Sequence, residues 1–165
     1  FAGGLLGAAA HELLLKPRSQ NTAAAQLEAA GFILFVCVHN SGRSQMAKAF
    51  FNAAAAARRL PFRAESAGTV PGERINSLVA EAMREIGFDL SAERPKAMTD
   101  AMVVDATRVI TMGCAVDAAA CPAILLKGVV DWGLPDPAGM PLEEVRQVRE
   151  MVRDKVDALI KELRP

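Results

Sequence analysis

The most distinctive hydrophobic segment of the chain is an apolar run at residues 32–36 that ends at Cys37. A short continuous apolar run, rich in aromatic and branched residues, is typical of a strand buried on both faces of a parallel sheet. A polar loop follows at residues 38–42, and a helical pattern begins directly after it. The pattern therefore predicts a buried strand that leads, through a short loop, into the N-terminus of a helix.

The rest of the chain alternates short apolar runs with stretches of helical periodicity. The expected strands lie at 60–64, with a turn over 66–69, at 107–112 and near 125–130; the expected helices lie at 44–59, about 75–86, 99–104 and 142–163, with a loop over 88–98. Strands that alternate with helices form βαβ units, so the pattern predicts an α/β domain built on a parallel sheet. In such sheets the functional residues collect beyond the C-terminal ends of the strands.

Residues 1–30 differ in character from the rest. Residues 1–15 are apolar and rich in small residues, and basic residues follow at Lys16 and Arg18. The stretch is too short for a full membrane span and lacks the basic start of a signal peptide. It resembles the cytoplasmic end of the last helix of an aquaporin-type channel, so a fusion to a membrane channel is one interpretation. A helix that packs on the domain is the other. We therefore expect an N-terminal helical appendage and linker at 1–30, and the α/β domain at 31–165.

Composition and charge narrow the function classes. Lys+Arg and Asp+Glu both count 19, so the net charge gives no indication of nucleic acid or of an anionic membrane surface as a partner. Three cysteines, an odd number, argue against a secreted disulfide scaffold and favour thiol chemistry in the cytoplasm. There is no Cys-x2-Cys pair, and His11 and His39 are the only histidines, so a zinc site is not expected.

The loop after the first strand has the composition of an oxyanion site. Its backbone N–H groups would turn inward at a helix N-terminus, where the helix dipole favours negative charge. Arg43 adds a planar fork of donors, and the same positive field stabilises the thiolate of Cys37, which makes it a nucleophile. We call residues 38–44 the oxyanion loop: Val38, His39, Asn40, Ser41, Gly42, Arg43 and Ser44.

Three residues of the oxyanion loop have more specific expected roles. Gly42 lets the backbone close round the anion, and Ser44 can donate a hydrogen bond to the sulfur. Asn40 is expected to hold the shape of the loop, because its side chain can bond backbone groups and it tolerates a left-handed conformation. The alternative is a buried structural cysteine that precedes an arginine by chance. The position between a buried strand and a helix start favours the oxyanion site.

Two cysteines follow the third expected strand, at positions 114 and 121. A helical segment between them would span roughly 10 Å, so their sulfurs would then meet only after a rearrangement. They are either partners of Cys37 in a relay of thiols or small apolar residues in an alanine-rich segment.

Asp136 lies between two prolines, Pro135 and Pro137. The prolines fix the backbone and present the carboxylate rigidly, and a carboxylic acid above an oxyanion pocket can protonate a leaving oxygen. A plain Asp-Pro turn is the alternative.

Four segments together resemble the low-molecular-weight tyrosine phosphatase fold and, within it, the thioredoxin-coupled arsenate reductases. They are CVHNSGRSQMA, ESAGT, the Cys114/Cys121 pair with the proline that follows it, and DWGLPDPAG, and the part of the chain that resembles the fold extends from about residue 32 to residue 163. The resemblance implies a single domain with a four-stranded parallel sheet flanked by helices, and neither a bound cofactor nor a metal.

The resemblance also implies a role for each candidate residue. Cys37 would attack arsenate held by the loop amides and Arg43, and Asp136 would protonate the departing oxygen. Cys114 would then attack Cys37 and release arsenite. Cys121 would attack Cys114 and leave a Cys114–Cys121 disulfide, which thioredoxin or a similar dithiol protein would reduce.

The chain departs from the family pattern in two places. The phosphatases often carry a second cysteine in the loop and two tyrosines after the Asp-Pro, where this chain has Gly42 and Ala138-Gly139. No aromatic wall then lines the entrance, which weakens a role in aryl-phosphate hydrolysis. Some of the reductases hold a potassium ion with an acidic residue of the first helix. This chain has Lys48 there, so that ion is not expected.

Three hypotheses for function follow. The first is a thioredoxin-coupled arsenate reductase, for which Cys114 and Cys121 are essential. The second is a low-molecular-weight protein tyrosine phosphatase, in which those two cysteines are incidental or regulatory. The third is a non-catalytic oxyanion sensor or a regulator of the attached channel, which would bind an anion without turnover.

Overall fold

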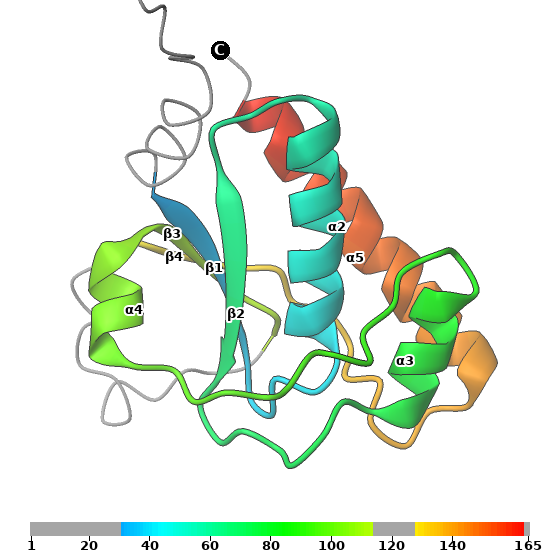
Figure 1. Ribbon diagram of the computed structural model, residues 1–165. Helices are drawn as coiled ribbons and strands as arrows, with labels where there is room; N and C mark the ends of the chain where they lie inside the picture. Colours follow the sequence, from blue (N-terminus) through cyan, green and yellow to red (C-terminus); the bar gives the residue numbers. More distant parts are fainter. Residues whose placement is uncertain (1–30, 114–127, 164–165) are drawn as a thin grey trace, which may run out of the picture.

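The sheet of the α/β domain is as predicted. The computed structural model describes residues 31–113 and 128–163, which are coloured in Figure 1. Its elements are β1 (Phe32–Cys37), α2 (Arg43–Ala57), β2 (Arg63–Gly68), α3 (Ser77–Arg84), α4 (Asp100–Asp105), β3 (Ala106–Thr111), β4 (Val129–Asp131) and α5 (Leu142–Glu162). Within the described ranges the strands form one four-stranded sheet in the order β2-β1-β3-β4, and every pairing is parallel. The predicted four-stranded parallel sheet with flanking helices is confirmed.

Strand β1 is apolar throughout because both of its faces are covered. Successive side chains of a strand point to opposite faces. Ile33, Phe35 and Cys37 pack in the larger core under α2, α3 and α5, whereas Leu34 and Val36 pack in a smaller core with residues of α4 and β3. Figure 1 shows α2 and α5 on one side of the sheet and α4 on the other. The unbroken run of apolar residues is therefore the signature of a central strand.

Helix α5 closes the larger core against α2. Its buried positions recur at helical spacing and its remaining positions are mostly polar, as expected for a helix with one face on a core. The buried apolar residues are Val145, Val148, Val152, Val156, Leu159 and Ile160. Helices α2 and α5 lie side by side in Figure 1 and pack against each other.

The chain topology places Cys37 at the functional edge of the sheet. Strand β1 has β2 on one side and β3 on the other, so the strand order reverses at β1. In open parallel sheets a ligand binds at such a reversal, outside the C-terminal strand ends. Cys37 is the last residue of β1, and α2 begins six residues later at Arg43.

The predicted second strand at 60–64 is wrong in its bounds. Strand β2 covers Arg63–Gly68, so the predicted turn at 66–69 is largely strand. Pro61 cannot donate to a ladder, and pairing begins only where Arg63 lies opposite Phe32. The residues that suggested a turn are small for another reason: Ser66 and Ala67 are fully buried beside β1.

The other elements agree with prediction to within a few residues. The fourth strand, expected near 125–130, covers Val129–Asp131 within the described part of the chain. Among residues 31–113 and 128–163 no helix has the length and apolar character that crossing a bilayer requires. Residues 1–30, Cys114 and Cys121 lie outside the described residues, so the predicted appendage and the predicted relay stay predictions.

Candidate active site

The sulfur of Cys37 lies among hydrogen-bond donors of the oxyanion loop. Cys37 is only 3% exposed. The backbone N–H of Asn40 donates to its Sγ at 3.2 Å, and the Oγ of Ser44 lies 3.0 Å from the same atom. Donors directed at the sulfur stabilise negative charge on it. The predicted contact between Ser44 and the sulfur is confirmed.

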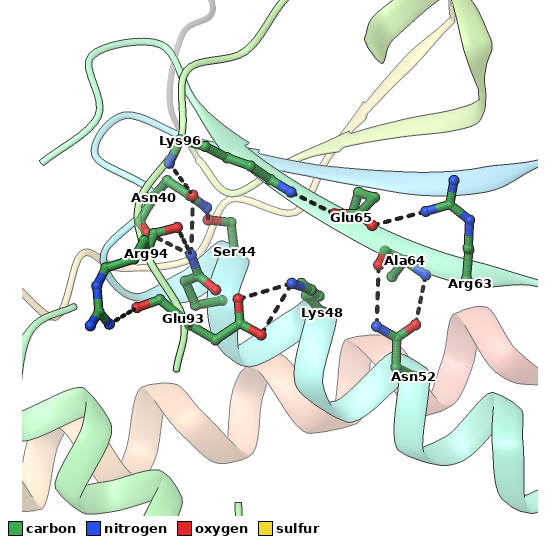
Figure 2. A network of polar contacts seen from close by, with 11 residues as sticks. Asn40, Ser44, Lys48, Asn52, Arg63, Ala64, Glu65, Glu93, Arg94 and Lys96 are labelled. Atoms are coloured by element: carbon green, nitrogen blue, oxygen red, sulfur yellow. Dashed lines mark hydrogen bonds and ion pairs between the residues drawn. The ribbon is translucent and has the colours of Figure 1, made fainter. Parts of the chain in front are cut away.

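Asn40 holds the oxyanion loop in its shape. It has a positive φ of 51° and no exposed surface. Its Oδ1 accepts from the backbone N–H of Lys96 at 3.0 Å and from Nε2 of Gln45 at 3.1 Å. Its Nδ2 donates to Ser44 Oγ at 2.8 Å, and Figure 2 shows these contacts together. The predicted role of Asn40 in the shape of the loop is confirmed.

These bonds give the hydroxyl of Ser44 a direction. A backbone N–H can only donate, so the bond from Lys96 fixes which end of the Asn40 amide is the oxygen. The nitrogen end therefore faces Ser44 and donates to it. The Ser44 oxygen accepts from Asn40, so its own hydrogen is free to point to the sulfur of Cys37. A chain of donors from Asn40 through Ser44 thus ends at the sulfur.

Arg43 is buried and held by backbone carbonyls. Its Nη1 donates to the carbonyl oxygens of Met112, at 2.7 Å, and Leu134, at 2.8 Å, and the residue is 5% exposed. The N-cap of α2, Gly42, makes no side-chain cap hydrogen bond. The backbone N–H of Gln45 donates to the carbonyl of Gly42 at 3.0 Å, and the N-terminal end of α2 adds its dipole to the positive field. Guanidinium and helix start together suit a bound anion.

Asp136 reaches the same place from the other side. Its Oδ2 lies 3.1 Å from Nη2 of Arg43, and its side chain is 50% exposed. Its Oδ1 accepts from the backbone N–H of Ala138 at 3.1 Å, which fixes the carboxylate at the rim. The structure therefore brings Cys37, Arg43 and Asp136 together, as the sequence predicts.

The three residues line one small cavity. Its volume is about 40 Å³, and its lining residues are Cys37, His39, Ser41, Gly42, Arg43, Asn76, Asp136, Pro137 and Ala138. No phenylalanine or tryptophan is among them. A hollow of about 650 Å³ between α2 and β2 is larger, but its lining contains no cysteine and lies away from Cys37. The chemistry therefore belongs to the small cavity, which suits a small ion.

Gly42 brings the two walls of the cavity together. A Cβ at this position would lie 3.1 Å from Cγ of Pro137 and 3.5 Å from Cγ2 of Val79. The absence of a side chain lets the residue after Asp136 pack directly on the oxyanion loop. The contact with Pro137 lies next to the carboxylate of Asp136, while closure of the loop round an anion stays a prediction.

A second layer of polar contacts surrounds the loop, and Figure 2 shows it. Gln45 is 1% exposed and its Nε2 also donates to the backbone oxygen of Asn40 at 3.1 Å. Lys48 Nζ bonds both carboxylate oxygens of Glu93, at 2.9 and 3.2 Å. The position that departs from the family pattern, Lys48, thus forms an ion pair inside the chain.

Some site residues were not predicted. Asn76 lines the cavity and caps α3, because its Oδ1 accepts from the N–H groups of Leu78 and Val79. An asparagine before an apolar helical run is a recognisable cap, so this one was available in the sequence. The carbonyls of Met112 and Leu134 were not, because backbone groups have no identity in a sequence.

Asp131 is another charged group near Arg43. Partial desolvation acts to raise the pKa of Asp131, but three hydrogen bonds and the charge of Arg43 outweigh it, so that the pKa lies below its usual value. The donors are Thr111 Oγ1, at 2.7 Å, and the backbone N–H groups of Gly113, at 2.6 Å, and of Gly133.

Comparison with known proteins gives a consistent picture. Residues 32–165 match the family described as low molecular weight phosphotyrosine protein phosphatase. A protein of Halobacterium salinarum with a provisional arsenate reductase name is 36% identical over 133 residues, covering 79% of this chain and 92% of that protein. The glutaredoxin arsenate reductase of Synechocystis sp. is 32% identical over 130 residues, covering 78% of this chain and 95% of that protein.

The solved structures agree with the sequences. An arsenate reductase in the phosphate binding state superposes with a TM-score of 0.71 at 30% identity, covering 81% of this chain and 99% of that one.

Proposed function

Since the chain belongs to the low molecular weight phosphotyrosine protein phosphatase family, we propose that it is an arsenate reductase of that family, acting in arsenic detoxification and resistance. The observation that supports this best is the small cavity in which a buried cysteine, a buried arginine and an exposed carboxyl group converge. The match also spans more than nine-tenths of the length of each of two relatives that are named as arsenate reductases.

The first step joins arsenic to sulfur. Arsenate binds to the loop N–H groups and Arg43, and the thiolate of Cys37 attacks the arsenic. Asp136 donates a proton to the departing oxygen, which leaves as water. The product is an arsenate bound through sulfur to Cys37. Asp136 faces Arg43 at 3.1 Å, so the proton donor starts on the rim of the anion pocket.

The second step transfers two electrons. The thiolate of Cys114 attacks the Cys37 sulfur, the sulfur–arsenic bond breaks, and its electron pair stays on arsenic as arsenite is released. Cys121 then attacks Cys114, and Cys37 leaves as a thiolate. The Cys114–Cys121 disulfide accepts two electrons from an external dithiol protein. Cys114 and Cys121 lie outside the described residues, so this relay rests on the sequence.

The dithiol donor is thioredoxin in this proposal. A related protein bears a glutaredoxin name, which makes glutaredoxin the donor to test against it. The site lies at the C-terminal edge of the sheet, where Cys37 ends β1. A cytoplasmic location, with residues 1–30 as the end of a channel helix and its linker, completes the proposal.

Hydrolysis of phosphate monoesters is the second candidate, because the family description names phosphotyrosine phosphatases. The same thiolate, arginine and acid would serve a phosphoryl group. The composition of the cavity entrance argues against a phosphatase that acts on aryl phosphates. Ala138 lines the cavity where a tyrosine would stack on an aryl ring, and Gly139 beside it has no side chain.

The test is arsenate-dependent NADPH oxidation with thioredoxin and thioredoxin reductase, and in parallel with glutaredoxin, glutathione and glutathione reductase. Wild type should turn over with thioredoxin, and Cys114→Ser and Cys121→Ser should each lose turnover. Hydrolysis of para-nitrophenyl phosphate by the same samples is the matched control, because of the three cysteines it needs only Cys37. Both serine variants should keep whatever phosphatase rate the wild type has.

Cys37→Ser should abolish both reactions. A wild type that hydrolyses para-nitrophenyl phosphate but reduces no arsenate with either donor would establish the phosphatase instead. Anion binding with neither reaction would leave a sensor.

A further inference from the structure

Asp131 is an acidic residue near the anion cavity with no role in the mechanism above. It ends β4 and opens the segment that leads to Asp136. Its Oδ1 accepts from Thr111 Oγ1 at 2.7 Å and from the backbone N–H of Gly113 at 2.6 Å. A carboxylate beside an oxyanion site repels the substrate, so by charge alone Asp131 works against binding.

The bond to Gly113 connects Asp131 to Arg43 through one peptide group. The N–H of Gly113 and the carbonyl of Met112 belong to the same peptide plane. The N–H donates to Asp131, and the carbonyl accepts from Nη1 of Arg43 at 2.7 Å. A carboxylate at one end of the peptide and a guanidinium at the other polarise it in the same direction. Hydrogen bonds in such a chain strengthen one another.

The absence of a side chain at Gly113 lets this peptide lie directly against the backbone of Leu134. Gly113 has a φ of +83°, and a Cβ there would lie 2.9 Å from both N and O of Leu134. Leu134 supplies the second carbonyl that holds Arg43, at 2.8 Å. The segments that supply the Met112 and Leu134 carbonyls are therefore in direct backbone contact. The hydrogen bond from Gly113 to Asp131 holds the first of these segments.

We propose that Asp131 is a positioning residue for Arg43, which acts through the peptide between Met112 and Gly113 to hold the guanidinium in its anion-binding orientation. Nη1 of Arg43 is then fixed from the sheet side, which leaves Nη2 to face Asp136 and the cavity. The inference rests on the proposed function only in that the cavity binds an oxyanion. It does not depend on which reaction follows.

The test measures the dissociation constant of inorganic phosphate by calorimetry, so that no turnover is needed. Asp131→Ala removes both acceptor oxygens, and Asp131→Asn keeps one. Asp105→Asn, at the opposite end of the sheet directly before β3, is the matched control. We expect the dissociation constant to rise about tenfold in the alanine variant, the effect of about one charge-assisted hydrogen bond, and about threefold in the asparagine variant. The control should stay at the wild-type value.

The sign of the change separates this role from simple electrostatics. If Asp131 acts only as a charge, both variants bind phosphate more tightly than wild type, and the proposal is wrong. Thr111→Val, which removes the side-chain donor to Asp131, keeps the test open if the alanine variant does not fold. We expect it to weaken phosphate binding about twofold.

A double-mutant cycle with Arg43→Lys checks the path of the effect. The lysine keeps the positive charge but lacks the planar fork that the Met112 carbonyl holds. In that background Asp131→Ala should change phosphate affinity less than about twofold. A tenfold loss in both backgrounds would mean that Asp131 acts on something other than Arg43. Phosphate binding by a wild type that reduces no arsenate would overturn the reductase and leave this inference standing.

Discussion

The oxyanion loop and the segment that carries Asp136 face the same cavity but are held in very different ways. In the loop, Asn40, Arg43 and Ser44 are all buried and are bonded to the sulfur, to the neighbouring backbone or to each other. In the acid segment, residues 132–138, Leu134 and Pro137 are buried while Asp136 is half exposed. The oxyanion loop is fixed by a buried hydrogen-bond network, whereas the side chain of Asp136 is exposed to solvent.

The difference matches what each wall does. The oxyanion loop must offer the same set of donors to every incoming anion, and a rigid network provides this without reorganisation. The acid must reach the departing oxygen and receive a proton from water afterwards, which exposure allows. Substitution of the exposed Asp136 should therefore reduce the rate and leave the fold intact, whereas substitutions in the loop should damage both.

The largest expected effect is that of Asp136→Asn. The asparagine cannot donate a proton in the same way, so kcat for arsenate adduct formation or para-nitrophenyl phosphate hydrolysis should fall about 10²- to 10³-fold. Phosphate should bind at least as tightly, because a negative charge next to Arg43 is removed. The melting temperature should not change, since an exposed ion pair contributes roughly 0–1 kcal/mol.

Asp154→Asn, an exposed aspartate of α5, is the control for the acid variant. A fall of several degrees in the melting temperature of Asp136→Asn would show that the acid segment is structural after all.

Asn40→Ala should affect both properties. It leaves the N–H of Lys96 without its acceptor, removes one of the acceptors of Gln45 and places alanine at a φ of 51°. We expect a loss of about 2–3 kcal/mol in the free energy of unfolding by urea. Activity should fall about 10- to 100-fold, because the donor chain to the sulfur is broken.

Asn52→Ala is the matched control for this variant. Asn52 also bonds a backbone through both ends of its amide, at 2.7 and 3.2 Å to Ala64, but lies away from the cavity. Figure 2 shows both asparagines. The control should lose stability and keep kcat. Equal loss of kcat in the two variants would mean that stability alone governs activity.

The same comparison explains what the sequence could predict. Every member of the oxyanion loop lies within eight residues of Cys37, so strand, loop and helix start are local and the pattern identifies them together. The orientation of Arg43 depends on carbonyls 69 and 91 residues away, at Met112 and Leu134. Such contacts follow from the register of the sheet and not from residue type.

Strand β2 shows the same limit in the fold. Ser66, Ala67 and Gly68 have the composition of a turn, and nothing local distinguishes a turn from a strand whose small residues are buried beside β1. The pairing with β1 is what makes these residues a strand. The sequence motif that opens at Asp131 likewise gave Asp136 a role, but the partner of Asp131 lies on β3 and becomes visible only in the structure.

A smaller effect is expected in the outer layer of the loop wall. Lys48 and Glu93 are partly exposed, so Lys48→Met should change the free energy of unfolding by less than about 1 kcal/mol. Activity should stay within about twofold, because the segment at 93–96 is also held by the hydrogen bond from the backbone N–H of Lys96 to Oδ1 of Asn40. The small difference should disappear at 1 M salt, which screens the pair. A tenfold loss of activity would place Lys48 in the network that holds the sulfur.

The smallest expected effect is on acid stability and concerns the other wall. The pKa of Asp131 is lower in the folded chain than its ordinary value of 3.8, so the unfolded chain takes up the proton first as the pH falls. The stabilisation by Asp131 is therefore complete above about pH 4 and is lost as the pH falls through the folded pKa. Asp131 is partly solvated, so after discounting for screening the contribution is at most about 1 kcal/mol. Urea unfolding at pH 7, 4 and 3 should give wild type and Asp131→Asn stabilities that differ most at pH 7 and converge at pH 3. A difference that grows towards acid pH would reverse the sign and show that the carboxylate is not favoured in the folded state.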